Sequence, residues 1–256
     1  MSTIRLKSTI TILLISSALL SFCKKSESET NEGQSNNELI INEPNAEADA
    51  TEGVELIHRA DYEFKYNEKF ELPYYVKYTI NQIDVSGKGD REGSKWEADS
   101  LVTTGTAVDK DYVGSGYDRG HLKPAAASKT NQEHMNQSHL FSNCSPQAPS
   151  FNRGGWRVIE SDVRGIVANK EQDSVIIYTG PVLNNITEFI GNENQIGIPK
   201  YHFKAVLYGD SSKAYAYLCP NKKLEKPYSN YIISIDSLES IINIDLYQGL
   251  HKSIEE

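Results

Sequence analysis

The chain has 256 residues, 38% of them hydrophobic and 24% charged, and a formal net charge of −9 at pH 7. This length is enough for one domain with a sizeable core, and the sequence has no internal repeat. Proteins that hold nucleic acid tightly through bulk electrostatics are usually basic, so the acidic balance argues against tight storage binding.

The N-terminal residues have the pattern of an export signal. Arg5 and Lys7 precede an apolar run that is too short and wrongly flanked for a membrane-spanning helix. The run ends in Leu20-Ser21-Phe22-Cys23, which resembles the lipobox of bacterial lipoproteins, although Phe22 stands where a small residue is usual. The resemblance implies that residues 1–22 are a lipoprotein signal peptide and that Cys23 is acylated. The chain would then be exported and lipid-anchored to a bacterial membrane, facing the periplasm or the cell surface. An ordinary signal peptide with an incidental cysteine is the alternative.

Residues 23–53 are expected to be the lipidated cysteine and a disordered acidic tether. The stretch is rich in Ser, Asn, Glu and Ala, and its only large aliphatic residues are the three at 39–41. It therefore cannot bury enough apolar surface to offset the entropy of ordering. Between Lys24 and Gly53, two lysines stand against eight carboxylates. We expect one globular domain over residues 54–256.

Strands are predicted where short runs of aromatic and β-branched residues precede turn residues, and helices where apolar residues have helical spacing or follow a capping motif. In chain order we expect a strand at Tyr74–Ile80, a short helix opened by a capping box at Thr130–Glu133, a helix at Asn152–Arg164, strands at Ser174–Tyr178, Tyr201–Tyr208 and Ala214–Leu218, and a helix at Ser234–Leu246. Strands and helices in this irregular order favour an α+β fold over a doubly wound sheet.

Two cysteines, Cys144 and Cys219, lie inside apolar, strand-like stretches. An oxidising compartment would permit a disulfide between them, and two buried free thiols are the alternative. The sequence has no CxxC pair, so a structural zinc site of the usual spacing is unsupported.

Basic residues are concentrated between Tyr117 and Gly165, where six of them stand against four carboxylates. A local positive strip on an acidic body suits transient phosphate binding with easy release. The six basic residues are Arg119, Lys123, Lys129, Arg153, Arg157 and Arg164.

The segment Asp118-Arg119-Gly120-His121 has residue types that could cut a phosphodiester. His121 can act as a base because the pKa of imidazole lies near working pH. Arg119 can donate two parallel hydrogen bonds to phosphate oxygens, and in a strand it would share a face with His121. Gly120 would let a backbone or ligand approach closely, and Asp118 could pair with His121 and fix the ring. Taken singly, each residue has a plainer explanation: an exposed arginine, a satisfied histidine or a turn glycine.

A second set of polar residues follows at Asn152 and Glu160. Magnesium prefers oxygen ligands and keeps most of its waters, so one or two amide or carboxylate oxygens suffice. On a regular helix these residues would be separated by about 12 Å of rise and about 80° of rotation, so Glu160 is expected to act through a metal-bound water. The alternatives are a helix N-cap for Asn152 and a solvated helix face for Glu160. Gly154-Gly155 is poor helix material, which predicts close packing or close approach there.

Several motifs in order resemble the DNA/RNA non-specific endonucleases, the endonuclease G-like family with a ββα-metal (His-Me) finger. The first is Asp118-Arg119-Gly120-His121-Leu122 with Ala126. The others are Tyr66-Asn67-Glu68, Pro73, Val76-Lys77-Tyr78, Ser142-Asn143-Cys144-Ser145-Pro146-Gln147, Phe151-Asn152 with Trp156 and Glu160, Tyr178-Thr179-Gly180-Pro181-Val182, Ile198-Pro199-Lys200 with Lys204, and Ser234–Glu239. The resemblance spans about residues 57–250. It implies an α+β fold with a central, mainly antiparallel sheet flanked by helices.

The resemblance also implies roles for individual residues. His121 would be the general base, and Asn152 would bind Mg²⁺ directly, with Mn²⁺ as a substitute. Glu160 would hold a metal-bound water, and Asn143 would position groups around His121.

Two arginines, Arg119 and Arg91, would contact the phosphate. The implied activity is Mg²⁺-dependent hydrolysis of phosphodiester bonds in DNA and RNA, leaving 5′-phosphates. Because contacts to sugar and phosphate carry no direct base readout, weak sequence preference is expected.

Two other functions fit part of the pattern. A zinc hydrolase could be built on His121, His134 and His139, although HExxH is absent and the last two are five residues apart, so they do not share a helix face. A surface lipoprotein could also bind nucleic acid without cutting it. Restoration of activity by zinc rather than magnesium would identify the first, and a nicking assay would identify the second.

Overall fold

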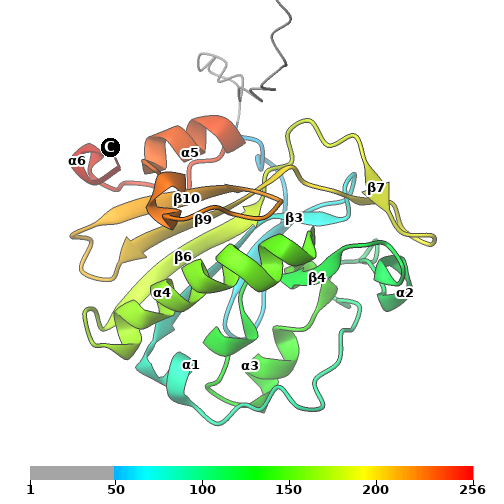
Figure 1. The fold of residues 1–256 in the computed structure, drawn as a ribbon, viewed down its shortest axis with the longest axis horizontal. Helices are drawn as coiled ribbons and strands as arrows, with labels where there is room; N and C mark the ends of the chain where they lie inside the picture. The colour runs from blue at the N-terminus through cyan, green and yellow to red at the C-terminus, as the bar shows by residue number, and fades with distance from the viewer. Residues whose placement is uncertain (1–48, 256) are drawn as a thin grey trace, which may run out of the picture. The chain divides into compact units, whose positions relative to one another are not determined.

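The computed structural model of the protein describes residues 49–255 (Figure 1). The expected signal peptide, the acylation site at Cys23 and the tether as far as residue 48 lie outside these residues. The segment 49–53, which we expected in the tether, hydrogen-bonds to the domain. Ala50 N donates to Asn243 O at 2.8 Å, and Lys65 Nζ donates to Thr51 O at 2.9 Å. Within the described residues, no helix has the length and apolarity needed to cross a membrane.

A seven-stranded sheet forms the centre of the described chain. Every pair of neighbouring strands in it is antiparallel, which confirms the expected mainly antiparallel sheet. The strands lie in the order β1 (Leu56–His58), β2 (Glu63–Asn67), β3 (Leu72–Asn81), β6 (Ser174–Pro181), β9 (Tyr201–Tyr208), β10 (Ala214–Pro220) and β11 (Ile232–Ile233).

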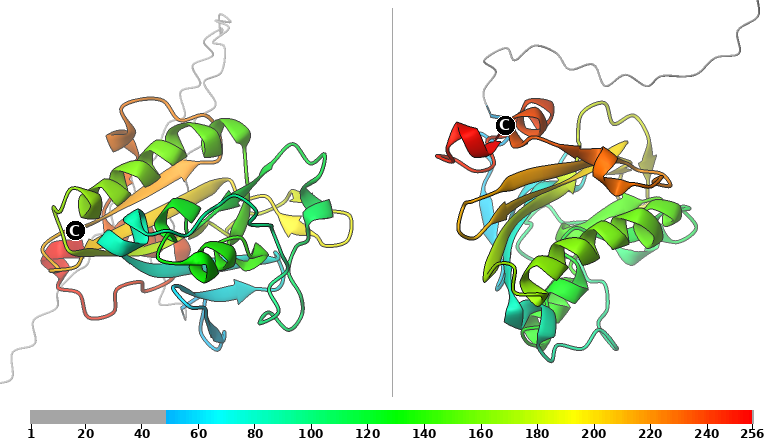
Figure 2. Two further views of the ribbon diagram at one scale, coloured as in Figure 1. Left: turned by 90° about the horizontal axis from the view of Figure 1, so that it is seen from below. Right: turned by 60° about the vertical axis from the view of Figure 1, so that its left-hand side comes forward.

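The two faces of the sheet bury different side chains because successive residues of a strand point to opposite sides. On β9, Val206 packs in the core beneath α4 (Arg157–Ala168), whereas Phe203 and Ala205 pack in the core beneath α5 (Ile235–Ile242). Figures 1 and 2 show α4 crossing one face of the sheet and α5 covering the other. The result is a three-layer α+β fold with helices on both faces, as expected.

The remaining elements are short. In chain order they are α1 (Gln82–Ser86), α2 (Asp109–Tyr112), β4 (Asp118–His121), η1 (Ala125–Ala127), α3 (Gln132–Gln137), η2 (Phe141–Asn143), β5 (Cys144–Gln147), the π-helical turn η3 (Phe151–Trp156), β7 (Phe189–Ile190), β8 (Ile196–Gly197), η4 (Tyr228–Tyr231) and α6 (Lys252–Glu255). Strands β4 and β5 pair with each other in a sheet of their own.

The four predicted strands are present, at or within β3, β6, β9 and β10. The predicted helix at Asn152–Arg164 is in fact two pieces, the turn η3 and the helix α4. The backbone leaves helical geometry at Gly154, where φ is −101° and ψ is −120°. This break lies between the two proposed metal-binding residues, so regular helical spacing does not describe their separation.

The other two predicted helices are also present, with different ends. The helix α3 is capped by Asn131, whose side chain accepts a hydrogen bond from His134 N at 2.9 Å. The predicted cap, Thr130, instead donates its hydroxyl to Asp84. The helix α5 stops at Ile242 because Asn243 takes a left-handed conformation with φ 54°, which ends a helix.

The two cysteines are free thiols, and both are buried. Cys144 packs among residues near β7 and β8, and its thiol lies 3.4 Å from the hydroxyl of Tyr112. Cys219 packs in the separate core beneath α4. The structure therefore has two buried free thiols and no disulfide between Cys144 and Cys219.

Candidate active site

The β4–β5 hairpin places Arg119 and His121 on one face. Both side chains line the same cleft, as expected for residues two apart on a strand. Gly120 points the other way, and a Cβ atom there would lie only 2.1 Å from Cδ of Gln147. The close approach predicted at this glycine is therefore made by a buried side chain of the neighbouring strand.

The cleft has a volume of about 760 Å³ and lies between β4, η3 and α4. Five of its lining residues are arginines, against two carboxylates, so it is electropositive on a chain that is acidic overall. A cleft of this charge suits a polyanion such as a nucleic-acid backbone. The lining residues are Arg91, Trp96, Asp118, Arg119, His121, Pro124, Ala125, Ala126, Asn152, Arg153, Arg157, Glu160 and Arg164.

His121 has an environment that keeps its imidazole neutral. Its ring packs 4.5 Å from the ring of Trp96 and 4.6 Å from that of His139, centroid to centroid. Burial, then His139 and then Arg91 hold the pKa of His121 well below its usual value of 6.5. Its Nε2 has no hydrogen-bond partner among the described residues. A neutral imidazole that lines a cleft can accept a proton there.

Asp118 does not pair with His121, contrary to our expectation. Its carboxylate accepts hydrogen bonds from Asn152 Nδ2 at 2.9 Å and from Arg153 Nε at 2.8 Å. Burial raises the pKa of Asp118, but these two partners outweigh it, and the net pKa is lowered. Asp118 therefore ties the base strand to the turn that carries Asn152, and it orients the amide rather than the imidazole.

Asn152 and Glu160 offer oxygen atoms to the same cleft. Asn152 lies inside η3, whose N-cap is Ser150, so the alternative reading of Asn152 as an N-cap is wrong. Because its Nδ2 donates to Asp118, its amide oxygen is the atom left for a ligand. The Glu160 side chain is half-buried and lines the cleft, so it does not lie on a solvated helix face. Burial raises the pKa of Glu160, and Lys204, Arg164 and Arg91 oppose that rise. One amide and one carboxylate oxygen in a cleft fit a hydrated Mg²⁺ ion.

Asn143 lies behind the cleft rather than in it. It is fully buried, its Oδ1 accepts from Lys123 N at 2.7 Å, and its Nδ2 donates to Lys123 O at 2.9 Å and Ser138 O at 2.8 Å. Its backbone oxygen accepts from Leu122 N at 3.0 Å. These bonds clamp the chain immediately after His121, which matches a positioning role.

The proposed phosphate-binding arginines, Arg91 and Arg119, both line the cleft. Arg119 also forms an ion pair with Asp109. Trp96 and Arg164 also line the cleft: Arg164 was expected in the basic strip but without a role of its own, and Trp96 was not expected at the site. Arg164 follows Glu160 by four residues, which places both on one helix face, and its Nη1 has no hydrogen-bond partner among the described residues. The helical spacing of these two residues was the available signal for Arg164.

The three-histidine zinc site is not assembled. His139 does contact His121, but its Nδ1 lies 2.9 Å from Met135 O. His134 lies against Asp61 instead, 3.2 Å from its Oδ2. Between residues 49 and 255, no group of three His, Cys, Asp or Glu side chains is arranged to hold a metal ion.

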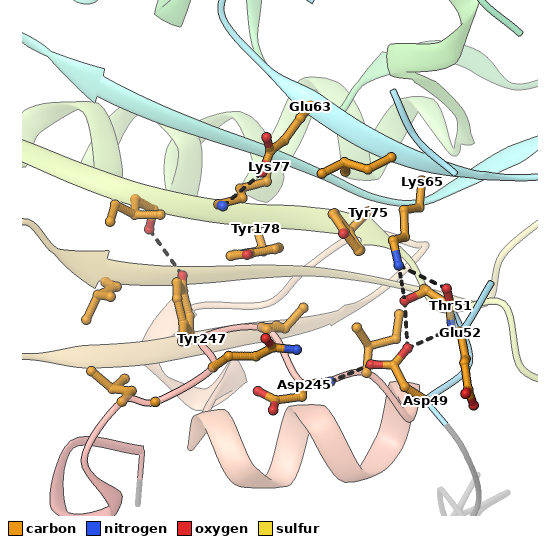
Figure 3. A pocket seen from close by; sticks show the side chains of 18 of the residues that line it. Asp49, Thr51, Glu52, Glu63, Lys65, Tyr75, Lys77, Tyr178, Asp245 and Tyr247 are labelled. Atoms are coloured by element: carbon orange, nitrogen blue, oxygen red, sulfur yellow. Dashed lines mark hydrogen bonds and ion pairs between the residues drawn. The ribbon is translucent and has the colours of Figure 1, made fainter. Parts of the chain in front are cut away.

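A second cavity, of about 690 Å³, lies on the α5 side of the sheet (Figure 3). Both of its lysines already have partners. Lys77 Nζ lies 2.8 Å from Glu63 Oε1, and Lys65 Nζ donates to Thr51. A ligand would have to compete with these pairs, so the arginine-lined cleft is the better candidate for binding an anion.

Comparison with known proteins identifies the family of the chain. Residues 44–253 match the family model described as DNA/RNA non-specific endonuclease. A nuclease of Syncephalastrum racemosum is 29% identical over 223 residues, covering 78% of this chain and 69% of the relative. Mitochondrial endonuclease G of Bos taurus is 28% identical over 201 residues, covering 73% and 67%. A crystal structure of an EndoG/EndoGI complex has the same fold, with a TM-score of 0.71 at 23% identity, covering 78% of this chain and 88% of that one. Since the family model matches most of its length, this chain belongs to the DNA/RNA non-specific endonucleases and is a nucleic-acid hydrolase.

Proposed function

We propose that the protein is a Mg²⁺-dependent endonuclease that cuts DNA and RNA with little sequence preference, with His121 as its general base. The observation that carries this proposal is a neutral His121 that lines an arginine-rich cleft together with Asn152 and Glu160. A base, cations for the phosphoryl oxygens and oxygen ligands for a metal are the parts that phosphodiester hydrolysis needs.

Each group has a defined task in this mechanism. His121 takes a proton from the attacking water, and Arg91, Arg119 and Arg164 bind the phosphoryl oxygens as charge develops there. Asn152 would hold Mg²⁺, which Mn²⁺ could replace, with Glu160 holding a metal-bound water. When bound there, the metal would stabilise negative charge on the departing 3′ oxygen, so that the product carries a 5′-phosphate.

The chemistry of the cleft also accounts for weak sequence preference. Its charged lining consists of guanidinium and carboxylate groups suited to phosphate and metal, and contacts to phosphate carry no direct base readout. DNA and RNA share this backbone charge, so both are expected to be substrates.

A nicking assay tests the proposal against the alternative of a silent, nucleic-acid-binding surface protein. Supercoiled plasmid and single-stranded RNA should both be cut in Mg²⁺, giving relaxed and then linear plasmid without discrete sequence-specific fragments. The end group is checked by labelling, which should find 5′-phosphates. Tight binding with no cutting of either substrate, in Mg²⁺ or Mn²⁺, would favour the silent protein.

The membrane anchor is a separate proposal that rests on the sequence at residues 1–23 and the acidic stretch after it. A coil of about thirty residues has a mean reach of about 30 Å, which would hold the domain off an acidic lipid surface. Cys23→Ser should release the nuclease from the membrane fraction and leave its specific activity unchanged. Mass analysis of the mature N-terminus checks this directly, and an unmodified Cys23, or cleavage downstream of it, would refute the anchor.

A further inference from the structure

The hairpin that carries His121 is not part of the central sheet. Strands β4 and β5 pair with each other in a separate two-stranded sheet. Hydrogen bonds that involve side chains help to fix these two strands against the central sheet. One such contact comes from β9, where the buried ring of His202 shares a hydrogen bond with Ser145 on β5, with 2.9 Å between Nε2 and Oγ.

This hydrogen bond is made to β5 at the position that pairs with the residue before His121. Ser145 is the cross-strand partner of Gly120, the residue between Arg119 and His121. Ser145 is itself fully buried, so the bond is shielded from water. A displacement of Ser145 would therefore move the strand that presents His121 to the cleft.

The same ring also supports the turn that carries the proposed metal ligands. His202 stacks on Phe151 with 5.2 Å between centroids and 25° between planes, and Phe151 stacks in turn on Trp156 at 5.0 Å. Phe151 precedes Asn152 directly, and Trp156 precedes Glu160 by one helical turn. One buried ring thus contacts both halves of the active site.

The chemistry of His202 is not what packing alone would favour. Its second ring nitrogen, Nδ1, has no hydrogen-bond partner among the described residues. A buried polar atom without a partner costs stability, and a phenyl ring would fill the same space without that cost. Burial and then Lys204 lower the pKa of His202 to about 3, so the ring is neutral at working pH. The histidine therefore has a neutral polar edge toward Ser145 and a flat face toward Phe151.

We propose that His202 is a positioning residue, which joins the base strand to the metal-binding turn and so sets the separation of His121 and Asn152. The inference rests on the proposed function of the cleft. His202 does not line the cleft and has no exposed surface, so it acts through the residues that it contacts, which are Ser145, Phe151 and Trp156.

Two substitutions separate the two contacts. His202→Phe keeps the stack and removes the hydrogen bond, as does Ser145→Ala from the other side. Each should lower kcat about ten- to hundredfold, because misplacing a reacting group by about 1 Å can cost that much. The KM for plasmid DNA should stay within about threefold, since the cleft arginines are untouched. The double variant should lose no more than either single one, because both remove the same bond.

His202→Asn makes the opposite change. Its amide can still hydrogen-bond to Ser145, but the ring that stacks on Phe151 is gone. Its main effect should be weaker metal binding, measured with Mn²⁺ by electron paramagnetic resonance in the absence of nucleic acid. His202→Phe should bind Mn²⁺ as the unaltered protein does. Phe203→Leu is the matched control, because Phe203 is the next residue on β9, equally buried, on the α5 face. It should lower Tm and leave the kcat of the folded protein unchanged.

The expected pattern is thus a loss of kcat in His202→Phe and Ser145→Ala, weaker Mn²⁺ binding in His202→Asn, and neither effect in Phe203→Leu. Unaltered kcat in both His202→Phe and Ser145→Ala would overturn the proposal. An equal loss of kcat in Phe203→Leu would also overturn it, because the effect would then follow stability alone. Failure of the unaltered protein to cut nucleic acid at all would overturn the proposed function instead.

Discussion

His121→Ala is expected to lower kcat by about 10²–10⁴-fold while nucleic-acid binding and folding stay nearly intact. Removal of the imidazole deletes the group that accepts the proton from water, whereas the arginines that bind the backbone remain in the cleft. The comparison requires kcat, KM and Tm measured on the same preparation. His58→Ala is the matched control, because His58 is an exposed histidine on β1. A His121→Ala protein that cuts at the normal rate would rule out His121 as the base.

The pH dependence gives a second check on the base. The pKa of His121 lies well below 6.5, and activity requires the unprotonated ring. Therefore kcat/KM should fall only when the pH drops through this lowered pKa. Burial, His139 and Arg91 cause this shift, in that order. Arg91→Gln removes one positive charge, which raises the pKa of His121 and moves the acid limb to higher pH. The same profile with and without Arg91 would contradict a base at His121 in this electrostatic environment.

Much of the fold could be predicted because its signals are local. The run of aromatic and β-branched residues at Tyr201–Tyr208, which ends at the turn residues Gly209-Asp210, predicts a strand that is observed with the same bounds. The two faces of that strand bury different cores. The helix start at Asn131 and the stop at Asn243 depend on single side-chain contacts and on one left-handed residue. Neither the cap at Asn131 nor the left-handed conformation of Asn243 follows from the periodicity of apolar residues. The predicted ends of these helices were therefore less accurate than their predicted positions.

The site shows the same division between local and distant information. Arg119 and His121 share a face because they are two apart on one strand, which the sequence shows directly. The partner of Asp118 could not be predicted that way, since Asn152 lies 34 residues further along the chain. Asp118 orients Asn152 because η3 folds back against β4, and that approach exists only in three dimensions.

The break in helical geometry at Gly154 could not be predicted from the helical spacing of apolar residues. A continuous helix would separate Asn152 and Glu160 along its axis, yet both line one cleft. The structure shows why glycine is needed at position 155. A Cβ atom at Gly155 would lie 2.8 Å from Leu224 Cβ, so close packing excludes a larger residue there. The sequence indicated close packing at this pair, but not which of the two glycines required it.

Removal of divalent metal should stop cleavage completely, and added Mg²⁺ should restore it, since both proposed ligands are oxygen donors. Full activity after exhaustive chelation would exclude the proposed mechanism. Asn152→Ala should remain slow even at saturating Mg²⁺, because it removes the direct ligand.

Asn152→Asp gives a sharper test, because a carboxylate is ordinarily at least as good a ligand for Mg²⁺ as an amide. In this chain, however, Asn152 Nδ2 donates to Asp118 at 2.9 Å, so Asn152→Asp would bring two carboxylates together without a proton between them. We therefore expect Asn152→Asp to be nearly as impaired as Asn152→Ala. Adding Asp118→Asn should restore part of the activity, because the amide at position 118 can then donate to the carboxylate at position 152. Full activity of Asn152→Asp alone would show that the bond to Asp118 does not orient the metal ligand. No gain in the double variant would show the same.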